Sequence, residues 1–388
     1  MYRPLVVSVI VVALACKGGT QSASAARASS SNPNAALASH PSNTAGDLAG
    51  PTSTTDAANT SSATAGSGTS AATGGASATS TPLPGAQNPN RVPNEMGRIM
   101  VLEYHLITDH NSDYARERGQ YRKDLELLYN RGYRPVNMTD VLDKKLNLPK
   151  GLSPVVFVFD DASPEQFSYI DNGGGKLTID PNSGMGIWLD FKKTHPDWNN
   201  KSVYCLLSGA AAGHNFFGDR GVKGQKSNWR FQKVKWLADN GFELCNHTLW
   251  HMQLSKYPDA AVQQQIAQCA LAIDSAVPGY KVRSMALPQG LWPKNRALAS
   301  KGSWTNPKTG KTTSYNYEVV FEVAGGPMRS PYDPAFNPGV TPRIQVIGNA
   351  IESMINKLES TGNAYISDGN PSVIARPAGP ATTSAAKR

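Results

Sequence analysis

The first hundred residues lack aromatic side chains and carry very little charge. No Phe, Trp or Tyr lies between Tyr2 and Tyr104, and only six of the 79 residues from Lys17 to Glu95 are charged. Most of the others are Ser, Thr, Ala, Gly, Asn and Pro, which bury too little apolar surface to offset the entropy lost on folding. We therefore expect residues 17–96 to be a low-complexity, disordered tether and residues 371–388 to be a disordered tail.

The shortage of charge, 17% over 388 residues, comes from these two ends. Residues 97–370 hold 57 of the 67 charges, which is about 21% of their 274 positions and ordinary for a folded domain. A domain of that length supports one large core. The composition excludes a small disulfide-stapled module, a multi-domain assembly and a fully disordered chain.

Runs of basic residues are also missing. The formal net charge is +9, but residues 97–370 contribute only +5 of it, and their Lys and Arg are scattered rather than interleaved with aromatics. Nucleic-acid binding needs a basic patch or stripe, so we do not expect it here. We expect the chain to be a monomer.

Cysteine is scarce, with four residues in the whole chain. Beyond Cys16 there are three, Cys205, Cys245 and Cys269, which is an odd number for a disulfide framework and lacks the paired spacing of a zinc knuckle. Because Cys205 and Cys245 lie inside apolar runs, we expect buried thiols rather than metal ligands.

Residues 1–16 have the pattern of a secretory signal. Arg3 precedes an apolar stretch from Leu5 to Leu14, too short for the roughly 20 apolar residues that span a bilayer. The ending Ala13-Leu14-Ala15-Cys16 resembles a bacterial lipobox. We therefore expect an exported lipoprotein of the bacterial cell envelope, held at the membrane through a lipid on Cys16. Plain secretion with cleavage near Ala25 and an uncleaved anchor are the alternatives.

Apolar strands and amphipathic helices alternate along residues 97–370. Val155 to Phe159 is a continuous apolar run, typical of a strand buried on both faces. The pattern predicts strands over 99–105, 133–136, 155–159, 203–207, 242–245, 283–287, 317–323 and 364–367. It predicts helices over 121–130, 139–146, 187–194, 228–239, 259–276, 295–299 and 343–360.

Such alternation indicates parallel strands covered by helices. We predict an α/β fold with a single (β/α) barrel, distorted and with about seven strands, preceded by the long disordered segment. No Gly-x-Gly-x-x-Gly or Walker-type loop follows the early strands, which argues against a nucleotide-binding fold.

Two polar clusters follow predicted strands. Asp160 and Asp161 come directly after Phe159, and His247 and His251 come shortly after Cys245. The carboxyl ends of parallel barrel strands meet at one mouth, so these side chains should face one another.

The spacing of these residues suits a metal centre. Two histidines four positions apart lie on one face of a helical turn, where their imidazoles can bind one cation. A carboxylate as third ligand leaves an open position for water, as in a catalytic zinc site. Two adjacent carboxylates point in different directions, so one can bind the metal while the other acts as general base. A turn or helix cap for the aspartates, and an incidental spacing for the histidines, are the alternatives.

These segments resemble a known family. Phe159-Asp160-Asp161 and His247-Thr248-Leu249-Trp250-His251 are similar to the first and second motifs of the polysaccharide deacetylases, the carbohydrate esterases with a NodB homology domain. Val101 to His105 resembles the Tyr-His first strand of members acting on poly-N-acetylglucosamine, and Gly132 to Val136 resembles the Gly-Tyr segment that follows. The resemblance covers about residues 98–368 and makes 97–370 the catalytic domain.

The resemblance implies roles for the clustered residues. Asp161, His247 and His251 would bind one divalent metal ion, usually zinc, and Asp160 would be the base that activates a water molecule. Leu287-Pro288-Gln289-Gly290 resembles the third motif, whose backbone amide near Gln289 would stabilise the oxyanion.

Residues around the predicted mouth would contact the sugar. We assign substrate binding to Trp250, Trp292, His105 and Pro288, and Trp188 is a further candidate for stacking. Core or rim packing is the alternative for each tryptophan.

The chain departs from the family pattern at four places. Ala162 stands where Gly is usual, Ala286 where many members have an Arg that orients the catalytic Asp, and Gln289 where an aromatic is usual. No Leu-x-His motif appears after Arg343, although that histidine is the family's general acid. The proton could come instead from Asp160, His105 or His214.

We therefore expect a metal-dependent hydrolase that removes acetyl groups from an N-acetylated cell-wall or extracellular polysaccharide. A catalytically degenerate carbohydrate-binding protein on the same scaffold is one alternative. An esterase acting on O-acetyl groups of a glycan is the other.

Overall fold

The computed structural model describes residues 91–209 and 214–377. The predicted signal peptide, most of the predicted tether and residues 378–388 lie outside the described residues. The described ends pack against the barrel: Arg91 Nε donates to the carbonyl of Gly151 at 2.7 Å, and the amide of Glu95 donates to the carbonyl of Ala375 at 2.8 Å. Described residues on both sides of the predicted range 97–370 thus make hydrogen bonds within the structure.

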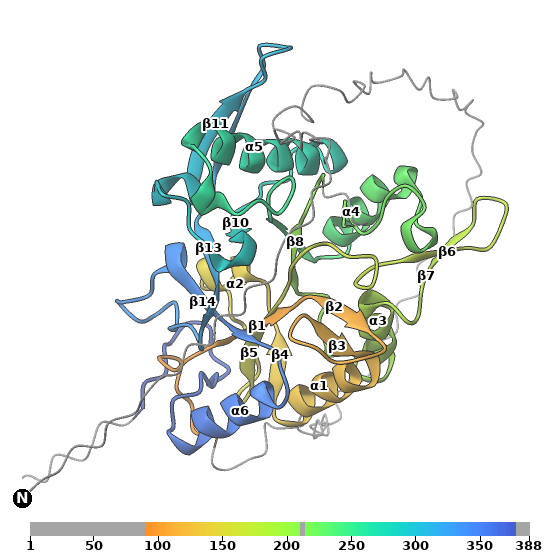
Figure 1. Ribbon diagram of the computed structural model, residues 1–388. Coiled ribbons are helices and arrows are strands. Elements are labelled where there is room, and N and C mark those ends of the chain that lie inside the picture. Colours follow the sequence, from red (N-terminus) through yellow and green to blue (C-terminus); the bar gives the residue numbers. More distant parts are fainter. Residues whose placement is uncertain (1–90, 210–213, 378–388) are drawn as a thin grey trace, which may run out of the picture. The chain divides into compact units, whose positions relative to one another are not determined.

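Seven parallel strands form a closed barrel, which confirms the predicted fold class (Figure 1). The strands follow one another around the ring in the order β1, β14, β13, β10, β9, β8 and β5, and β5 pairs with β1 to close it. The ring strands are β1 (Met100–Tyr104), β5 (Ser153–Phe159), β8 (Val203–Leu206), β9 (Glu243–Asn246), β10 (Ser284–Ala286), β13 (Val319–Gly325) and β14 (Thr341–Gln345). A further strand, β4 (Tyr133–Pro135), pairs with the first half of β5.

Three small two-stranded sheets lie outside the ring. They are β2 (Leu106–Thr108) with β3 (Ala115–Glu117), β6 (Tyr169–Asp171) with β7 (Leu177–Ile179), and β11 (Lys301–Thr305) with β12 (Thr312–Asn316). The β11–β12 hairpin extends past α5 at the top of Figure 1. None of these small sheets was predicted.

Helices surround the barrel. The α-helices are α1 (Arg118–Asn130), α2 (Met138–Leu142), α3 (Gly184–Thr194), α4 (Arg230–Asp239), α5 (Asp259–Ala276) and α6 (Ala350–Ser360). The short 3₁₀ segments are η2 (Val222–Gly224), η3 (Ser227–Trp229), η4 (Leu254–Lys256), η5 (Pro288–Gly290), η6 (Arg296–Ala299) and η7 (Pro338–Val340). Helices α1 and α3 begin at side-chain caps: Glu117 accepts from the amides of Gly119 and Gln120, and Ser183 accepts from that of Gly186. Within the described ranges, no helix combines the length and apolarity needed to cross a membrane.

Three predicted elements differ from the structure. The predicted helix over 343–360 begins only at Ala350, because residues 341–345 pair with β1 and β13 as strand β14. The predicted helix over 295–299 is the 3₁₀ segment η6, and the predicted last strand over 364–367 makes only isolated bridges. The first difference matters most, because it places Arg343 on a barrel strand.

Strand alternation sorts the side chains into two layers. Leu102 and Phe157 belong to the layer that packs against α1 and α3, whereas Val101, Val156 and Val158 belong to a second cluster inside the barrel. Successive side chains of a strand point to opposite faces. The next inward positions after Val101 and Val158 are Glu103 and Asp160, which places two carboxylates in the barrel at its carboxyl end.

The structure corrects the expectation of buried thiols at Cys205 and Cys245. The two residues are register partners on the parallel strands β8 and β9, and their sulfurs form a disulfide. The odd total of cysteines arises because Cys269 is free and buried. Sequence spacing hid the pair, since the partners are 40 positions apart and the whole of α4 lies between them.

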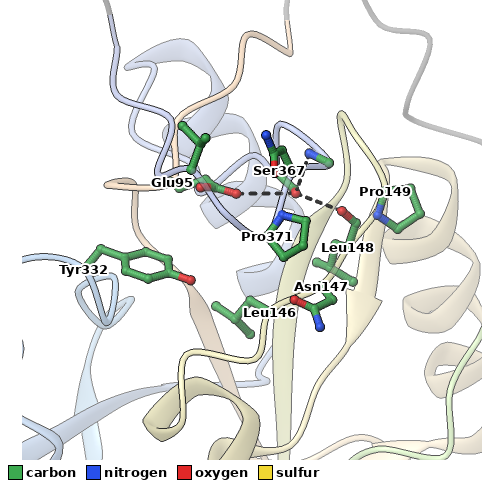
Figure 2. A pocket seen from close by; sticks show the side chains of 11 residues that line it. Glu95, Leu146, Asn147, Leu148, Pro149, Tyr332, Ser367 and Pro371 are labelled. Atoms are coloured by element: carbon green, nitrogen blue, oxygen red, sulfur yellow. Dashed lines mark hydrogen bonds between the residues drawn. The ribbon is translucent and has the colours of Figure 1, made fainter.

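A pocket lies beside the segment that leads into β5 (Figure 2). Glu95, Tyr332 and the segment from Leu146 to Pro149 line it. Ser367 Oγ holds its wall together by donating to the carbonyl of Leu148 at 2.9 Å and contacting Glu95 Oε1 at 3.5 Å. This region thus holds the two termini of the folded domain against the barrel.

A buried lysine fastens the loop behind the barrel mouth. Lys233 of α4 is fully buried, and its Nζ donates to the carbonyl of Phe217 at 2.5 Å and to Gln225 Oε1 at 2.8 Å. The amide of Phe217 donates in turn to the carbonyl of Ala162 at 2.8 Å. Burial lowers the pKa of Lys233 from 10.5 to about 7.

Replacing Lys233 should change how stability depends on pH. Between pH 7 and 10.5 the unfolded chain holds a proton on Lys233 that the folded chain lacks, so this residue makes stability rise with pH. We compare the free energies of unfolding of the wild type and Lys233→Met. The value for the wild type minus that for the variant should rise by up to about 1.4 kcal/mol per pH unit from pH 7 to 9. Urea denaturation at several pH values measures it.

Lys235→Met, at an exposed position of the same helix, is the matched control. Parallel stability curves for the wild type and Lys233→Met would show that the Lys233 ammonium is not desolvated.

Candidate metal centre and active site

The loop after β5 presents Asp160 and Asp161. The amide of Asp160 donates to the carbonyl of Tyr104 at 2.9 Å, which continues the pairing of β5 with β1. Asp161 and Ala162 then adopt positive φ angles of 78° and 49°, a costly conformation for residues with a Cβ and one found at functional sites. The turn leaves Asp160 buried and lets the Asp161 carboxylate reach the mouth.

The loop after β9 presents His247 and His251, but it is not the helical turn that we expected. Thr248 and His251 have φ angles of 75° and 56°, which an α-helix excludes. Asn246 Oδ1 accepts from the amide of Thr248 at 2.8 Å, and Thr248 Oγ1 accepts from the amide of His251 at 3.1 Å. These side-chain bonds replace helical bonds and form a compact loop.

Helix α5 holds this loop in place through Gln265. Its carbonyl accepts from the amide of Leu249 at 3.0 Å, and its Oε1 accepts from that of Trp250 at 3.0 Å. The loop also packs on Gly209, where a Cβ would lie 2.5 Å from Trp250 Nε1.

Asp161, His247 and His251 converge on one point. Asp161 Oδ1 lies 3.3 Å from His247 Nε2 and 3.5 Å from His251 Nε2. His247 Nδ1 lies 2.9 Å from the carbonyl of Ala286, which can only accept, so Nδ1 carries the hydrogen and Nε2 presents its lone pair. The structure thus brings together the three predicted ligands.

The donor atoms of this cluster fit a divalent metal. His247 Nε2 and Asp161 Oδ1 are buried and have no hydrogen-bond partner among the described residues. Buried polar atoms without a partner are costly and rare, so each points to an absent ligand. Two imidazole nitrogens and one carboxylate oxygen are a zinc-type set.

Electrostatics keeps Asp161 and His251 in forms that can bind a metal, whereas the neighbouring Asp160 and Asp161 outweigh burial and raise the pKa of His247. Burial alone would raise the pKa of Asp161, but His247 beside it brings that pKa well below its usual range. Burial and the neighbouring His247 lower the pKa of His251 to about 4. An ionised carboxylate and a neutral imidazole are the metal-binding forms.

Arg343 joins two buried carboxylates beside this cluster. From β14, its Nη1 donates to Asp160 Oδ1 at 2.9 Å and its Nη2 donates to Glu103 Oε1 at 2.8 Å. All three side chains are almost completely inaccessible to solvent. Arg343 therefore orients Asp160 from inside the barrel, the task that the resemblance assigns to an Arg at position 286.

Sequence reasoning missed Glu103 and the role of Arg343. Burial raises the pKa of Glu103 to about 7, against the opposing effect of Arg343. Its Oε2 is buried and has no hydrogen-bond partner within the described ranges. The available signal was a lone carboxylate in the apolar run Met100-Val101-Leu102-Glu103-Tyr104.

Of the two histidines considered as proton donors, His105 lies at the site. Its Nε2 is 3.8 Å from Glu103 Oε1, and it forms a second cluster with Glu103 and Asp160. Burial lowers the pKa of His105, so its imidazole tends to be neutral. His214 lies beside Asn215, which pairs with Leu207 at the end of β8.

The third-motif segment lies at the carboxyl end of β10. Pro288 is buried, and Gln289 has an exposed side chain and a φ of 57°. This strained turn sits next to Ala286, whose carbonyl orients His247.

The three tryptophans differ in how far a sugar could reach them. Trp250 is 40% exposed, and its place in the loop between the two histidines suits sugar contact. Trp292 is half-buried: its Nε1 donates to Glu322 at 2.8 Å, and the Arg296 guanidinium covers its ring at 3.8 Å. Trp188 is fully buried against Phe157, so it is a core residue and not a stacking surface.

A known protein family matches part of the chain that contains this site. Residues 198–302 match the family model described as polysaccharide deacetylase. This match confirms the resemblance to the polysaccharide deacetylase family. The matched range contains His247, His251 and Gln289, and it begins after Asp160 and Asp161. No curated protein matches the chain in sequence.

Solved structures with a similar chain trace have low sequence identity. A deacetylase from Streptococcus pyogenes, PplD, in complex with acetate, is 14% identical with a TM-score of 0.47 and covers 67% of this chain and 97% of its own. The putative polysaccharide deacetylase BA0330 from Bacillus anthracis is 14% identical with a TM-score of 0.46, covering 67% and 68%. IcaB from Ammonifex degensii is 16% identical with a TM-score of 0.44, covering 70% and 100%.

Removal of Arg343 should destabilise the fold, because its two buried acidic partners, Glu103 and Asp160, lose their counter-charge. Arg343→Ala leaves Glu103 and Asp160 buried without a counter-charge, so Glu103, whose pKa is already raised, must hold a proton in the folded state. We expect the variant to lower the free energy of unfolding by about 3–5 kcal/mol at neutral pH. Adding Glu103→Gln to Arg343→Ala should restore part of that loss, because one of the two buried acids no longer has to be neutralised. Urea denaturation measures both variants.

Arg329→Ala removes an exposed ion pair with Asp333 and should cost no more than about 1 kcal/mol. Equal losses in Arg343→Ala and the double variant would show that the Arg343–Glu103 contact has no energetic role.

Proposed function

We propose that this chain is a metal-dependent hydrolase that removes acetyl groups from an N-acetylated cell-wall or extracellular polysaccharide. The family match supports deacetylation of glycans. The observation that carries the finer proposal is the convergence of His247 Nε2, His251 Nε2 and Asp161 Oδ1 on one point, with two of these atoms buried and unpartnered in the described structure.

The three converging residues would hold the metal, and Asp160 would remain beside it. When bound, a divalent metal such as zinc supplies Lewis acidity and lowers the pKa of water in its coordination sphere. A catalytically degenerate binding protein would have no need to keep the three metal-ligating side chains of Asp161, His247 and His251 close together. The geometry therefore favours an enzyme over that alternative.

Asp160 is suited to accept the proton of the attacking water. Its Oδ1 is occupied by Arg343, which leaves Oδ2 facing the cluster at 4.0 Å from His247 Nε2. Burial would raise the pKa of Asp160, but the charge of Arg343 outweighs this and keeps the pKa low. A carboxylate that is ionised, oriented and adjacent to the nucleophile meets the needs of a general base.

Two groups of this chain would complete the reaction. The backbone amide near Gln289 would donate to the developing oxyanion. The leaving amine needs a proton, and Asp160 can return the one it accepted, with His105 as the other titratable group in contact with the Glu103–Asp160 cluster. An alkoxide-type leaving group needs less protonation than an amine, so hydrolysis of O-acetyl esters remains the second candidate activity.

A substrate panel tests the proposal directly. The purified, zinc-loaded full chain should release acetate from partially N-acetylated glucosamine polymer and much less from O-acetylated xylan. Elemental analysis should find one transition-metal ion per chain. The opposite substrate preference would make the chain an O-acetyl esterase, and a chain with no bound metal after zinc loading would contradict the proposed metal dependence.

The two aspartates should separate binding from turnover. Asp160→Asn should keep the metal and lose about 10²–10⁴-fold in turnover, as expected for loss of a general base. Asp161→Asn should lose metal affinity, with partial recovery of activity in excess zinc. Metal content and acetate release, measured on both variants, check this division. Metal loss in Asp160→Asn with retention in Asp161→Asn would reverse the two roles.

We also propose that the chain is exported and held at a membrane by a lipid on Cys16. The disulfide between Cys205 and Cys245 supports export, since disulfides persist mainly in oxidising compartments. The lipobox-like ending at Cys16 supports the anchor.

Anchoring is tested in a bacterial host by separating membrane and soluble fractions. The wild type should be found with the membrane, and Cys16→Ser should move it to the soluble exported fraction. An unchanged membrane fraction in Cys16→Ser would rule out the lipid.

A further inference from the structure

The segment from Pro293 to Asn316 is basic and contains no acidic residue. Its five cations are Lys294, Arg296, Lys301, Lys308 and Lys311. All five are exposed, and none forms an ion pair with any residue that the structure describes. Most arginines of the barrel, by contrast, are paired with carboxylates, as Arg283 is with Glu318.

Carboxylates on neighbouring elements do not cancel this charge. Asp259 of α5 contacts the segment by accepting from Asn295 Nδ2 at 3.1 Å, and Glu322 of β13 accepts from Trp292 Nε1 just before it. Counting both still leaves a surplus of three positive charges. Unpaired like charges repel one another, so such a cluster on a projecting hairpin favours an anionic partner.

The β11–β12 hairpin has two different faces. Gly302, Trp304, Thr313 and Tyr315 form the inner face, which packs with the apolar cluster beneath α5. The outer face alternates with them and is exposed throughout. Its register pairs are Lys301 with Asn316, Ser303 with Ser314, and Thr305 with Thr312.

The outer face therefore offers hydroxyl and amide groups together with positive charge. Lys308 and Lys311 extend this surface around the hairpin turn. Strand β11 rises about 3.3 Å per residue, so its four steps from Lys301 to Thr305 place roughly 13 Å between Lys301 and the turn that carries Lys308 and Lys311. Charges spread in this way suit an elongated ligand rather than one small ion.

We propose that the outer face of the β11–β12 hairpin and its turn bind an anionic polysaccharide. The hydroxyl and amide side chains can exchange hydrogen bonds with sugar hydroxyls, while the lysines neutralise acidic groups along the strand. A single-stranded nucleic acid would need exposed aromatics on which its bases stack, and a membrane surface would need apolar side chains to insert. The outer face has neither, because Trp304 and Tyr315 point to the inner face.

The hairpin is also linked to the candidate active site through the chain. Segment η5, with Gln289, is followed directly by Leu291 and Trp292 and then by η6, which packs against β11. An anionic glycan held by the hairpin would thus be bound by the segment that directly follows the third-motif loop, which the proposed function assigns to acetyl removal. The binding itself does not depend on that function.

Binding of polygalacturonate to the full chain tests the proposal. At about 50 mM salt, the triple variant Lys301→Ala/Lys308→Ala/Lys311→Ala should bind it about tenfold or more weakly than the wild type, and added salt should weaken wild-type binding. The matched control, Lys123→Ala/Lys176→Ala/Lys357→Ala, removes three exposed, unpaired lysines elsewhere among the described residues and should change affinity little. Acetate release from a short soluble N-acetylated oligosaccharide should be the same in wild type and hairpin variant.

Binding is measured without turnover, so failure of the deacetylase proposal would leave this test intact. Equal weakening by the two triple variants would overturn the hairpin site, because net charge alone would then explain binding. The wild type could instead bind single-stranded DNA or phosphatidylglycerol vesicles more tightly than polygalacturonate, and the hairpin variant could lose that binding. Such a result would overturn the choice of ligand.

Discussion

The buried guanidinium of Arg343 is the interaction on which the candidate site depends. Strand alternation points Glu103 and Asp160 into the same barrel mouth, and two carboxylates in a dry interior would repel each other and the ligand carboxylate of Asp161. Arg343 contacts both of the inner carboxylates and the carbonyl of Glu322. One cation thereby fixes the geometry of strands β1, β5, β13 and β14 at the end of the barrel where chemistry is expected.

The elements that depend on regular periodicity could be predicted from the sequence. The apolar run Val155 to Phe159 indicated a strand buried on both faces, and the spacing of 259–276 indicated a long helix; both are present. Placement of Asp160, Asp161 and the two histidines at one mouth followed from parallel strands alone. The parallel strand ends bring these residues to one mouth whatever the conformation of the histidine loop, so the incorrect prediction of a helical turn did not affect this placement.

The parts that could not be predicted rest on contacts between distant segments. Nothing local shows that Cys205 and Cys245 occupy register partners, or that Gln265 holds the loop at Leu249 and Trp250. Arg343 was hidden in the same way: residues 341–345 form a strand because β1 and β13 flank them. The hairpin β11–β12 escaped detection because its outer face is polar and its inner face has few apolar residues.

Ala162 shows how a small departure from the family pattern changes the character of the site. Its φ of 49° lies where glycine has no penalty, and Asp161, Thr248, His251 and Gln289 share this left-handed region. A glycine at position 162 would relax the backbone but allow the unfolded and partly open chain many more conformations. Alanine carries local strain instead and narrows the range of directions available to the neighbouring Asp161. The site is thus preorganised by loops whose strained backbone fixes the groups that they present.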